Sequence, residues 1–400
     1  MTHYQITIDD SLLPALFSGG SGLKPLLEQV LNQILLAQST EAVGAAPHER
    51  SEGRQGYRNG YRERTLQTRI GTLTLSVPRL RDGSFSPELW ERWQRSEQAF
   101  VLALLEMVIQ GVSTRKVEAV CEELCGAHFS KSTVSALCER LDPLVNTWQN
   151  RPLTEVSYPF LLVDALVIRV REDKRVRPVS LLLACGVRED GHREILGFAL
   201  GDSESEASWS DFFASLKKRG LSGVFLVTSD NHAGLVKAVE QQFQGVTWQR
   251  CQVHFVRNVL SACPAKEQKA LLCKLRHILE ASDEATARQQ LRETIEAFAS
   301  SAPRAMECLE KGFEDVIAVL CLPERYRKRL RSTNSVERLN EEIRRRERVI
   351  RIFPNRESVT RLLGALLMEF DEAFTTGKVY LDMTEFNNER KEKHGSQEQN

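Results

Sequence analysis

Apolar positions in the first third of the chain change their spacing twice. Residues 23–38 carry apolar side chains at helical intervals and predict an amphipathic helix, followed by a loose linker near residues 43–48. Leu73, Leu75 and Val77 alternate with polar residues, which is typical of a strand with one buried face. Between residues 99 and 145 the spacing is helical again, and this stretch predicts three helices.

The second and third of these helices are separated by a turn of the length found in helix-turn-helix motifs. Ser113 and Ser130 are candidate N-caps, and the helix that begins near Ser130 would present Lys131 and Ser132 to DNA. Two short helices around a glycine also occur in ordinary helical bundles. The motif alone therefore leaves both interpretations open.

The middle of the chain is rich in strand-like runs. Residues 158–170 predict a central strand, and residues 179–187 and 194–200 predict two more that complete an antiparallel meander. A helix, a fourth strand, a second helix and a fifth strand are expected over residues 207–220, 223–230, 233–243 and 246–253. Three strands in hairpin order, followed by alternating helices and strands, are typical of an α/β ribonuclease H-like fold.

The remaining sequence is mainly helical. Residues 256–322 show no strand-like run and predict an all-helical insertion, after which one helix starts near Asn334 and another covers residues 357–374. The polar end of the chain predicts a disordered tail. The expected domains are a helical segment (1–48), a DNA-binding region (49–150), a ribonuclease H-like core in two parts (151–255 and 326–385), the helical insertion (256–325) and the tail (386–400).

The total charge of the chain is balanced, but positive charge is concentrated in two segments. Lys plus Arg and Asp plus Glu each number 54, but arginine dominates from Arg50 to Arg95 and from Arg325 to Arg361. Local basic patches are what phosphate binding needs, although a charge run can also be a solvated helix face. No apolar run reaches the ~18 residues of a membrane helix, and the first residues lack the features of a signal peptide. We expect a cytoplasmic protein with no membrane partner, whose nine cysteines are reduced.

Two aspartates stand at positions that need a chemical explanation. Asp164 lies inside the apolar run LLVDALVI, where an ionised carboxylate is costly unless a cation compensates it. An ion pair with Arg169 or Arg171 is the alternative. Asp230 follows the apolar fourth strand, and strands one and four are neighbours in this fold, so the two carboxylates would meet. Asp230 would otherwise cap a turn or a helix.

A third carboxylate, Glu337, lies on the helix near Asn334, at the edge of its apolar stripe. Three such carboxylates can hold two Mg²⁺ ions about 4 Å apart for phosphoryl transfer, and Mn²⁺ would substitute. The alternative is a capping box, with Asn334 as the N-cap and Glu337 three residues later.

Four long stretches carry a family resemblance, and they are GYRNGYRERTLQTRIGTLTLSVPRLRDGSF, LGFALGDSESEASW, WQRCQVHFVRN and TNSVERLNEEIRRRERVIRIFPNRESVTRL. In this order they resemble the Mutator-type transposases of bacterial insertion sequences. The resemblance implies a ribonuclease H-like domain with an Asp-Asp-Glu triad at Asp164, Asp230 and Glu337. It also implies an N-terminal domain that binds terminal repeats. Many relatives carry a Thr-Tyr pair where this chain has Leu166 and Val167.

Other candidate residues surround this triad. Cys251 and His254 match the family's Cys-x-x-His element, and they supply half of a structural zinc site, with Cys273 and His277 as the nearest further ligands. We expect instead that they support the carboxylates or the DNA. Arg344, two turns beyond Glu337, would reach a phosphate or lie on a solvated face. Trp209 is expected in the core rather than stacked on a base.

The expected function is that of a transposase that binds the terminal inverted repeats of its element, cleaves double-stranded DNA and joins the freed 3′-hydroxyl to another phosphodiester. Acting on two ends favours a homodimer. The alternatives are a metal-dependent nuclease or junction resolvase that never joins, and an inactive DNA-binding regulator. The residues expected at the DNA are Arg58, Arg62, Arg64, Lys131, Ser132, Arg338 and Arg345.

Overall fold

The computed structural model describes residues 6–7, 23–47, 49, 53–68, 70–81, 85, 98–125 and 130–397. Two compact units share the chain, Met1–Glu139 and Arg140–Asn400. Arg50 and Arg95, the ends of the first arginine-rich stretch, lie outside the described residues, as do the last three residues of the predicted tail. Among the helices described, none is both long and apolar enough to cross a membrane.

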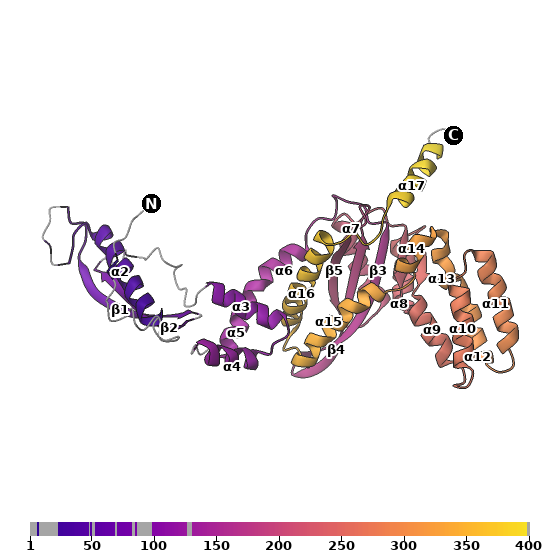
Figure 1. Cartoon of the computed structure of the whole chain (residues 1–400), viewed down its shortest axis with the longest axis horizontal. Coiled ribbons are helices and arrows are strands. Elements are labelled where there is room, and N and C mark those ends of the chain that lie inside the picture. The colour runs from indigo at the N-terminus through magenta and orange to yellow at the C-terminus, as the bar shows by residue number, and fades with distance from the viewer. Residues whose placement is uncertain are drawn as a thin grey trace. The chain divides into compact units, whose positions relative to one another are not determined.

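The first unit begins with a helix on a two-stranded sheet (Figure 1). α2 (Leu23–Val43) packs on the antiparallel pair β1 (Arg58–Thr68) and β2 (Gly71–Leu80). Leu73, Leu75 and Val77 are fully buried and form a cluster with Leu35 of α2, which confirms the predicted strand. Its partner strand β1 was not predicted, because most side chains of β1 are exposed and show no alternation.

The three predicted helices follow as α3 (Gln98–Ile109), α4 (Thr114–Cys125) and α5 (Lys131–Cys138), which pack on one another. Ser130 is the N-cap of α5, and its hydroxyl accepts the N–H of Thr133 at 3.2 Å. Lys131 and Ser132 are exposed on α5, as the helix-turn-helix interpretation requires.

The second unit is built on a five-stranded mixed sheet in the order β5-β4-β3-β6-β7. The strands are β3 (Phe160–Glu172), β4 (Arg175–Val187), β5 (Arg193–Gly201), β6 (Leu226–Ser229) and β7 (Thr247–Arg250). The first three form the predicted antiparallel meander, and β6 and β7 continue the sheet in parallel to β3. The sequence therefore predicted both the antiparallel meander and the neighbours β3 and β6.

Helices cover both faces of this sheet (Figure 1). α7 (Glu206–Lys218) and α8 (Ala233–Gln242) pack on one face, where Trp209 is fully buried with Phe213, Leu161 and Val163. This confirms Trp209 as a core residue. α15 (Asn334–Ile350) packs on β3, and α16 (Arg356–Thr376) packs on β5.

The boundary between the two units lies after Glu139 rather than after residue 150. η2 (Glu139–Leu141) leads into α6 (Asp142–Gln149), and α6 packs on α16 of the second unit. Arg361 donates from Nε and Nη2 to the Asp142 carboxylate at 2.6 and 2.7 Å. This long-range ion pair ties α6 to the sheet domain, and the local helical pattern around residue 150 gives no sign of it.

The helical insertion is present and has its own core. It comprises α9 (Gln252–Ser261), α10 (Gln268–Leu279), α11 (Glu284–Phe298), α12 (Pro303–Lys311), α13 (Phe313–Ile317) and η3 (Ala318–Cys321), and α14 (Glu324–Leu330) leads back to the sheet. Phe255, Leu275, Phe298 and Phe313 are among the residues buried between these helices.

The expectation of a disordered tail from residue 386 is wrong for the described residues. α17 (Thr384–Gln397) is helical, and Phe386 is buried with its ring 4.9 Å from that of Phe160 and 6.4 Å from that of Tyr326. The Phe386 side chain holds the start of an otherwise polar helix on the core. The polar composition of the segment as a whole gave no sign of this single contact.

Candidate active site

The sheet brings Asp164 and Asp230 together. β3 pairs in parallel with β6, with Leu162 opposite Thr228, and the same register two residues on places Asp230 beside Asp164. Residues aligned in this way point to the same face of a sheet. β6 ends at Ser229, so Asp230 stands at the carboxyl end of its strand.

Asp164 is a buried carboxylate whose neighbours are mostly negative. It is 8% exposed; its Oδ1 accepts the N–H of Ala165 at 3.0 Å and its Oδ2 accepts the Asn340 amide at 2.7 Å. Burial raises the pKa of Asp164 to about 7, and the charges of Asp230 and Glu337 add to the rise. A bound cation would strongly stabilise the ionised form of a carboxylate in this environment.

Glu337 belongs to α15, the helix that packs on β3. It lies in the first turn of that helix, and its Oε1 is 3.7 Å from Nε2 of His254 on α9. The capping box, which was the alternative for Glu337, is absent from this described segment, because the N-cap position belongs to Thr333 and Asn334 is already the first helical residue. The Glu337 side chain is therefore directed by its contact with His254.

α15 is held on β3 by two polar contacts. Asn340, one turn after Glu337, bonds Asp164, and Nη1 of Arg344 donates to the backbone carbonyl of Val167 at 2.8 Å and to Glu347 at 2.6 Å. Nη1 of Arg344 thus binds the strand and its own helix, and a contact of this guanidinium with a phosphate stays a prediction.

Cys251 links the ends of the elements that carry the carboxylates. It is fully buried, its N–H donates to Ser229 O at 2.6 Å, and its Sγ accepts the N–H and hydroxyl of Thr333 at 3.5 Å each. Burial alone would raise the pKa of Cys251, but the nearby His254 and the hydrogen bonds from Thr333 outweigh it and the pKa is lowered.

His254 lies between the Cys251 thiol and the carboxylates. The thiol contributes most to raising its pKa to about 8, and the negative charges of Asp164 and Glu337 act in the same direction. Its Nδ1 is buried and makes no well-aligned hydrogen bond to the described part of the chain. The imidazole therefore lies close to the Cys251 thiol without a well-aligned hydrogen bond to it. His254 is thus a positive group beside Asp164 and Glu337.

Sequence reasoning missed a fourth carboxylate. Glu204, in the loop before α7, lies 3.6 Å from Nδ1 of His232, and burial and the charge of Asp230 raise its pKa. The tight approach of this loop to α8 depends on Gly234, where a Cβ would lie 2.6 Å from the backbone nitrogen of Glu206. Its sequence signal was its place inside LGFALGDSESEASW, one of the stretches that carry the family resemblance.

The alternatives for the two aspartates have different outcomes. Arg169 and Arg171 are odd-numbered positions of β3 and point away from Asp164, so the alternative of an ion pair with either of them is wrong. Asp230 does form the expected turn contact, since its Oδ1 accepts the N–H of His232 at 3.2 Å. Within the described residues its Oδ2 accepts no hydrogen bond and can still take a ligand.

The predicted DNA-binding residues fall into two groups. Arg58 is half-buried, and its Nη2 donates to Thr40 Oγ1 at 2.9 Å and to the Ala45 carbonyl at 2.8 Å, so it joins β1 to the end of α2 and its DNA role stays a prediction. Arg64 is half-buried as well. The exposed members are Arg62, Lys131, Ser132, Arg338 and Arg345, and Arg345 pairs with Glu342 at 3.1 Å.

The donor set suits a hard divalent cation. Carboxylate oxygens are the ligands that Mg²⁺ and Mn²⁺ prefer, and the charges of Asp230 and Glu337 add to the rise in the pKa of Asp164. Among the described residues, no three His, Cys, Asp or Glu side chains already stand in a metal-binding arrangement. Binding therefore requires side-chain rotation within a site that is otherwise assembled.

Known proteins resemble this chain over most of its length. A transposase of insertion sequence element IS256 in transposon Tn4001 from Staphylococcus aureus is 47% identical over 362 residues, which cover 90% of this chain and 93% of that protein. A transposase of element ISRM5 from Rhizobium meliloti is 44% identical over 376 residues, 94% of each chain. The solved Mos1 strand transfer complex is 12% identical with a TM-score of 0.16, covers 57% of this chain and 78% of that one, and is too distant to carry an argument. The model of the family described as "Transposase, Mutator family" matches residues 7–377, and the chain belongs to that family.

Proposed function

We propose that this member of the Mutator transposase family nicks DNA at the ends of its own element and joins the freed 3′-hydroxyl to another phosphodiester. The observation that carries the proposal is that the charges of Asp230, at the end of β6, and Glu337, on α15, both raise the pKa of the buried Asp164 on β3. The strand order and the helical insertion between Asp230 and Glu337 support a ribonuclease H-like core for this chemistry.

The three carboxylates would hold Mg²⁺, which supplies activation of the attacking water or 3′-hydroxyl and stabilisation of the leaving oxygen. The protein's own part is to fix the carboxylates. Asn340 holds Asp164, the turn at His232 holds Asp230, and His254 holds Glu337. Cys251 joins the end of β6 to the turn before α15 and acts as a positioning residue for two of these groups.

The first unit would bind the terminal inverted repeats. Its exposed Arg62 and the exposed face of α5 with Lys131 and Ser132 provide phosphate and base contacts. Arg338 and Arg345, both exposed on the helix of Glu337, would contact DNA near the reacting phosphate. Two ends must be processed together, so we propose a homodimer that works on bacterial DNA in the cytoplasm.

The test uses full-length protein with an end-labelled duplex that carries the terminal repeat flanking its own gene. Cut and joined products are expected with Mg²⁺ or Mn²⁺, whereas Ca²⁺ should allow binding with little chemistry. Cut products without joining would indicate a nuclease, and bound but uncut DNA would indicate a regulator.

Substitutions then assign the carboxylates. Asp164→Ala, Asp230→Ala and Glu337→Ala should each abolish cutting, and double variants should resemble single ones because the ligands share one site. Salt-dependent DNA binding should survive in all of them. A Glu337→Gln protein that cuts and joins at the parental rate would remove Glu337 from the site.

A further inference from the structure

Arg193 lies on the same face of the sheet as Asp164. It starts β5 opposite Val187 of β4, and Val187 lies opposite Phe160 of β3, four residues before Asp164. Cross-strand partners share a face, and so do alternate residues of one strand. Two strands across and four residues along the sheet, the Cα atoms of Arg193 and Asp164 stand roughly 16 Å apart.

The guanidinium of Arg193 packs on two aromatic rings. Its Cζ lies 3.9 Å from the ring centroid of Phe374 on α16 and 4.4 Å from that of Tyr380. Tyr380 is itself fixed, because its N–H and that of Leu381 donate to the Gly191 carbonyl at 2.9 and 3.1 Å. The Arg193 side chain therefore has little freedom left to lose when it binds a ligand.

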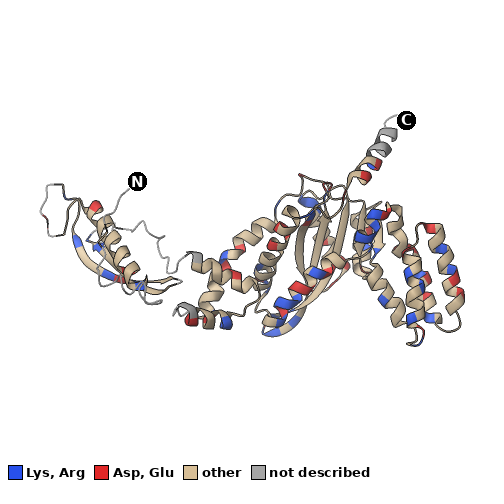
Figure 2. Cartoon of the chain, in the orientation of Figure 1, with Lys and Arg blue, Asp and Glu red and all other residues tan. Residues whose placement is uncertain are grey.

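Two further arginines, Arg329 and Arg338, surround this position. Cζ of Arg329 on α14 lies 5.0 Å from the Tyr380 ring centroid, and Arg338 is the residue after Glu337 on α15. Burial lowers the pKa of Arg193, and the charges of Arg329 and Arg338 act in the same direction. Figure 2 shows basic residues along α14 and α15. The arginine cluster of Arg193, Arg329 and Arg338 is therefore one positively charged region that begins beside Glu337.

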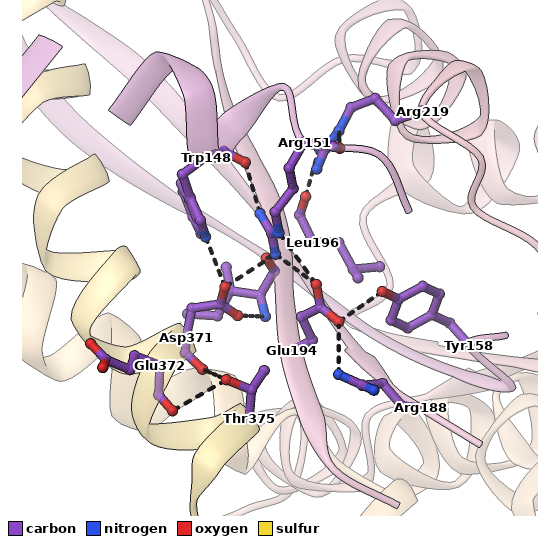
Figure 3. A network of polar contacts seen from close by, with 11 residues as sticks. Trp148, Arg151, Tyr158, Arg188, Glu194, Leu196, Arg219, Asp371, Glu372 and Thr375 are labelled. Atoms are coloured by element: carbon purple, nitrogen blue, oxygen red, sulfur yellow. Dashed lines mark hydrogen bonds and ion pairs between the residues drawn. The ribbon is translucent and has the colours of Figure 1, made fainter. Parts of the chain in front are cut away.

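The arginine cluster has no ion-pair partner among the residues that the structure describes, and its side chains donate no hydrogen bond to them. Arg151 of the same unit differs, since it donates to Glu194 at 2.9 Å and to Asp371 at 3.1 Å (Figure 3). In the described part of the chain, no nitrogen of Arg193 is both fully buried and unpartnered, so water reaches its donors. Unpaired guanidinium groups that solvent reaches are available to an anion, and a phosphate matches their fork of donors.

We propose that the arginine cluster binds the phosphodiester backbone of the reacting DNA strand, at phosphates that flank the one cut at Asp164. The inference rests on the proposed function. Arg193 stands too far from Asp164 to touch the reacting phosphate, whereas Arg338 extends the cluster toward Glu337. The ligand is DNA rather than an acidic protein segment, because the cluster lies on the face where the reacting strand must meet Asp164.

The test compares two full-length double variants that each lose two positive charges. Arg193→Gln with Arg329→Gln removes the arginines on the Tyr380 ring. Arg292→Gln with Arg304→Gln is the matched control, because both residues are exposed on the helical insertion and have no ion pair with a described residue. Binding to the end duplex is measured in Ca²⁺ against salt.

The first variant should bind roughly 10-fold or more weakly at equal salt, and its slope of log K against log salt should fall by about 1–2. The control should bind as the parent does. Equal losses in the two variants, or no loss in the first, overturn the proposal.

Folding is checked separately, because Arg193→Gln also removes contacts with two rings. Arg329→Gln alone changes an exposed side chain, and it should keep the parental melting temperature while part of the DNA affinity is lost. Phenylglyoxal, which modifies accessible guanidinium groups, probes the wild-type protein directly. The end duplex should slow modification of Arg193 and Arg329 and leave that of Arg292 unchanged. Modification of Arg329 at the same rate with and without DNA overturns the proposal, whatever the stability of the variants.

Two reactions assign the source of the strand, which presents the same phosphodiester in an element end and in a target. Slower cutting of the end duplex with normal joining of precut ends assigns the site to the element end, and the reverse assigns it to the target; either result supports the site. A changed oligomeric state without DNA, at unchanged DNA affinity, would indicate an acidic protein partner and overturn it. A failure of the proposed function looks different, since wild-type protein would leave the end duplex uncut while DNA still protected Arg329.

Discussion

The side-chain amide of Asn340 donates a 2.7 Å hydrogen bond to Oδ2 of Asp164, across 176 positions of the chain. Asn340 stands one turn after Glu337 on α15. The same contact therefore partners the buried aspartate and sets the position of Glu337 above the sheet. It is the most direct link between the strand and the helix that carry the candidate metal ligands.

Replacing Asn340 tests this link. Asn340→Ala should lower Mg²⁺ affinity or cutting about 10–100-fold, as the loss of a group that orients a metal ligand typically does. Part of the loss should be recovered at high Mg²⁺, because the carboxylates themselves remain. The measurement is the cutting rate against Mg²⁺ concentration. An unchanged Mg²⁺ dependence would show that Asn340 only packs there.

The metal-free protein should lose stability as pH rises through the pKa of Asp164. Burial raises that pKa to about 7, so the folded state binds the proton more tightly than the unfolded chain. The resulting stabilisation is complete below about pH 4 and is lost as pH rises through about 7. Asp164→Asn stays neutral, so its advantage over the parent should grow by up to about 4 kcal/mol between pH 4 and pH 8.

Unfolding in a chelator, followed at several pH values for both proteins, measures that difference. Mg²⁺ added at pH 8 should raise the melting temperature of the parent more than that of Asp164→Asn, because it binds only the folded site. Parallel pH profiles for the two proteins would contradict the assignment of this destabilisation to Asp164.

Arg58 and Arg62 should behave differently although both are arginines of β1. Arg58→Gln removes hydrogen bonds to Thr40 of α2 and to Ala45 after it, and should lower the free energy of unfolding of the first unit by about 1–3 kcal/mol. Arg62→Gln changes an exposed side chain and should weaken DNA binding without a change in melting temperature. Thermal unfolding and DNA titration of each variant separate the two effects.

Most of the sheet could be predicted because its strands are continuous apolar runs with turns between them, and Asp164 was noticed because it interrupts such a run. The same reasoning could not find β1, whose side chains face solvent on most positions. Burial patterns along the chain report on a strand only when one of its faces is covered.

Glu204, Asn340 and Phe386 could not be predicted for a different reason. Each acts through a partner far away in the sequence, such as Asp164 for Asn340 or Phe160 for Phe386. Local spacing carries no information on such contacts. Glu337 is the opposite case, since its local spacing favoured a capping box that the fold does not form.

Cys251 and His254 should support the site without holding zinc. Metal analysis of the purified protein should give less than one zinc per chain. Cys251→Ser keeps an acceptor for Thr333 and should fold, whereas Cys251→Val leaves the Thr333 hydroxyl and N–H unpartnered and should reduce cutting further. Stoichiometric zinc that disappears in Cys251→Ser would contradict this view.

The polar network in Figure 3 should govern the stability of the second unit. Asp371 of α16 is 8% exposed, and its carboxylate accepts the Trp148 indole N–H at 2.7 Å and the Ile195 N–H at 2.6 Å. Arg151 donates to Asp371 at 3.1 Å and to Glu194 at 2.9 Å. These contacts join the end of α6, the start of β5 and α16.

Removing the Asp371 carboxylate would leave its hydrogen-bond donors without an acceptor at a position that water reaches poorly. Asp371→Ala leaves the indole and the Ile195 N–H unpartnered and one side of the Arg151 guanidinium uncompensated, so it should cost about 3–5 kcal/mol of unfolding free energy. Glu372→Ala is the matched control, because it removes the adjacent carboxylate of the same helix, whose side chain is exposed, and should change stability by about 0.5 kcal/mol or less. Denaturant unfolding of both variants measures the difference. Equal stability of the two variants would show that water replaces the hydrogen bonds of Asp371 and that the network does not hold α6 on the sheet.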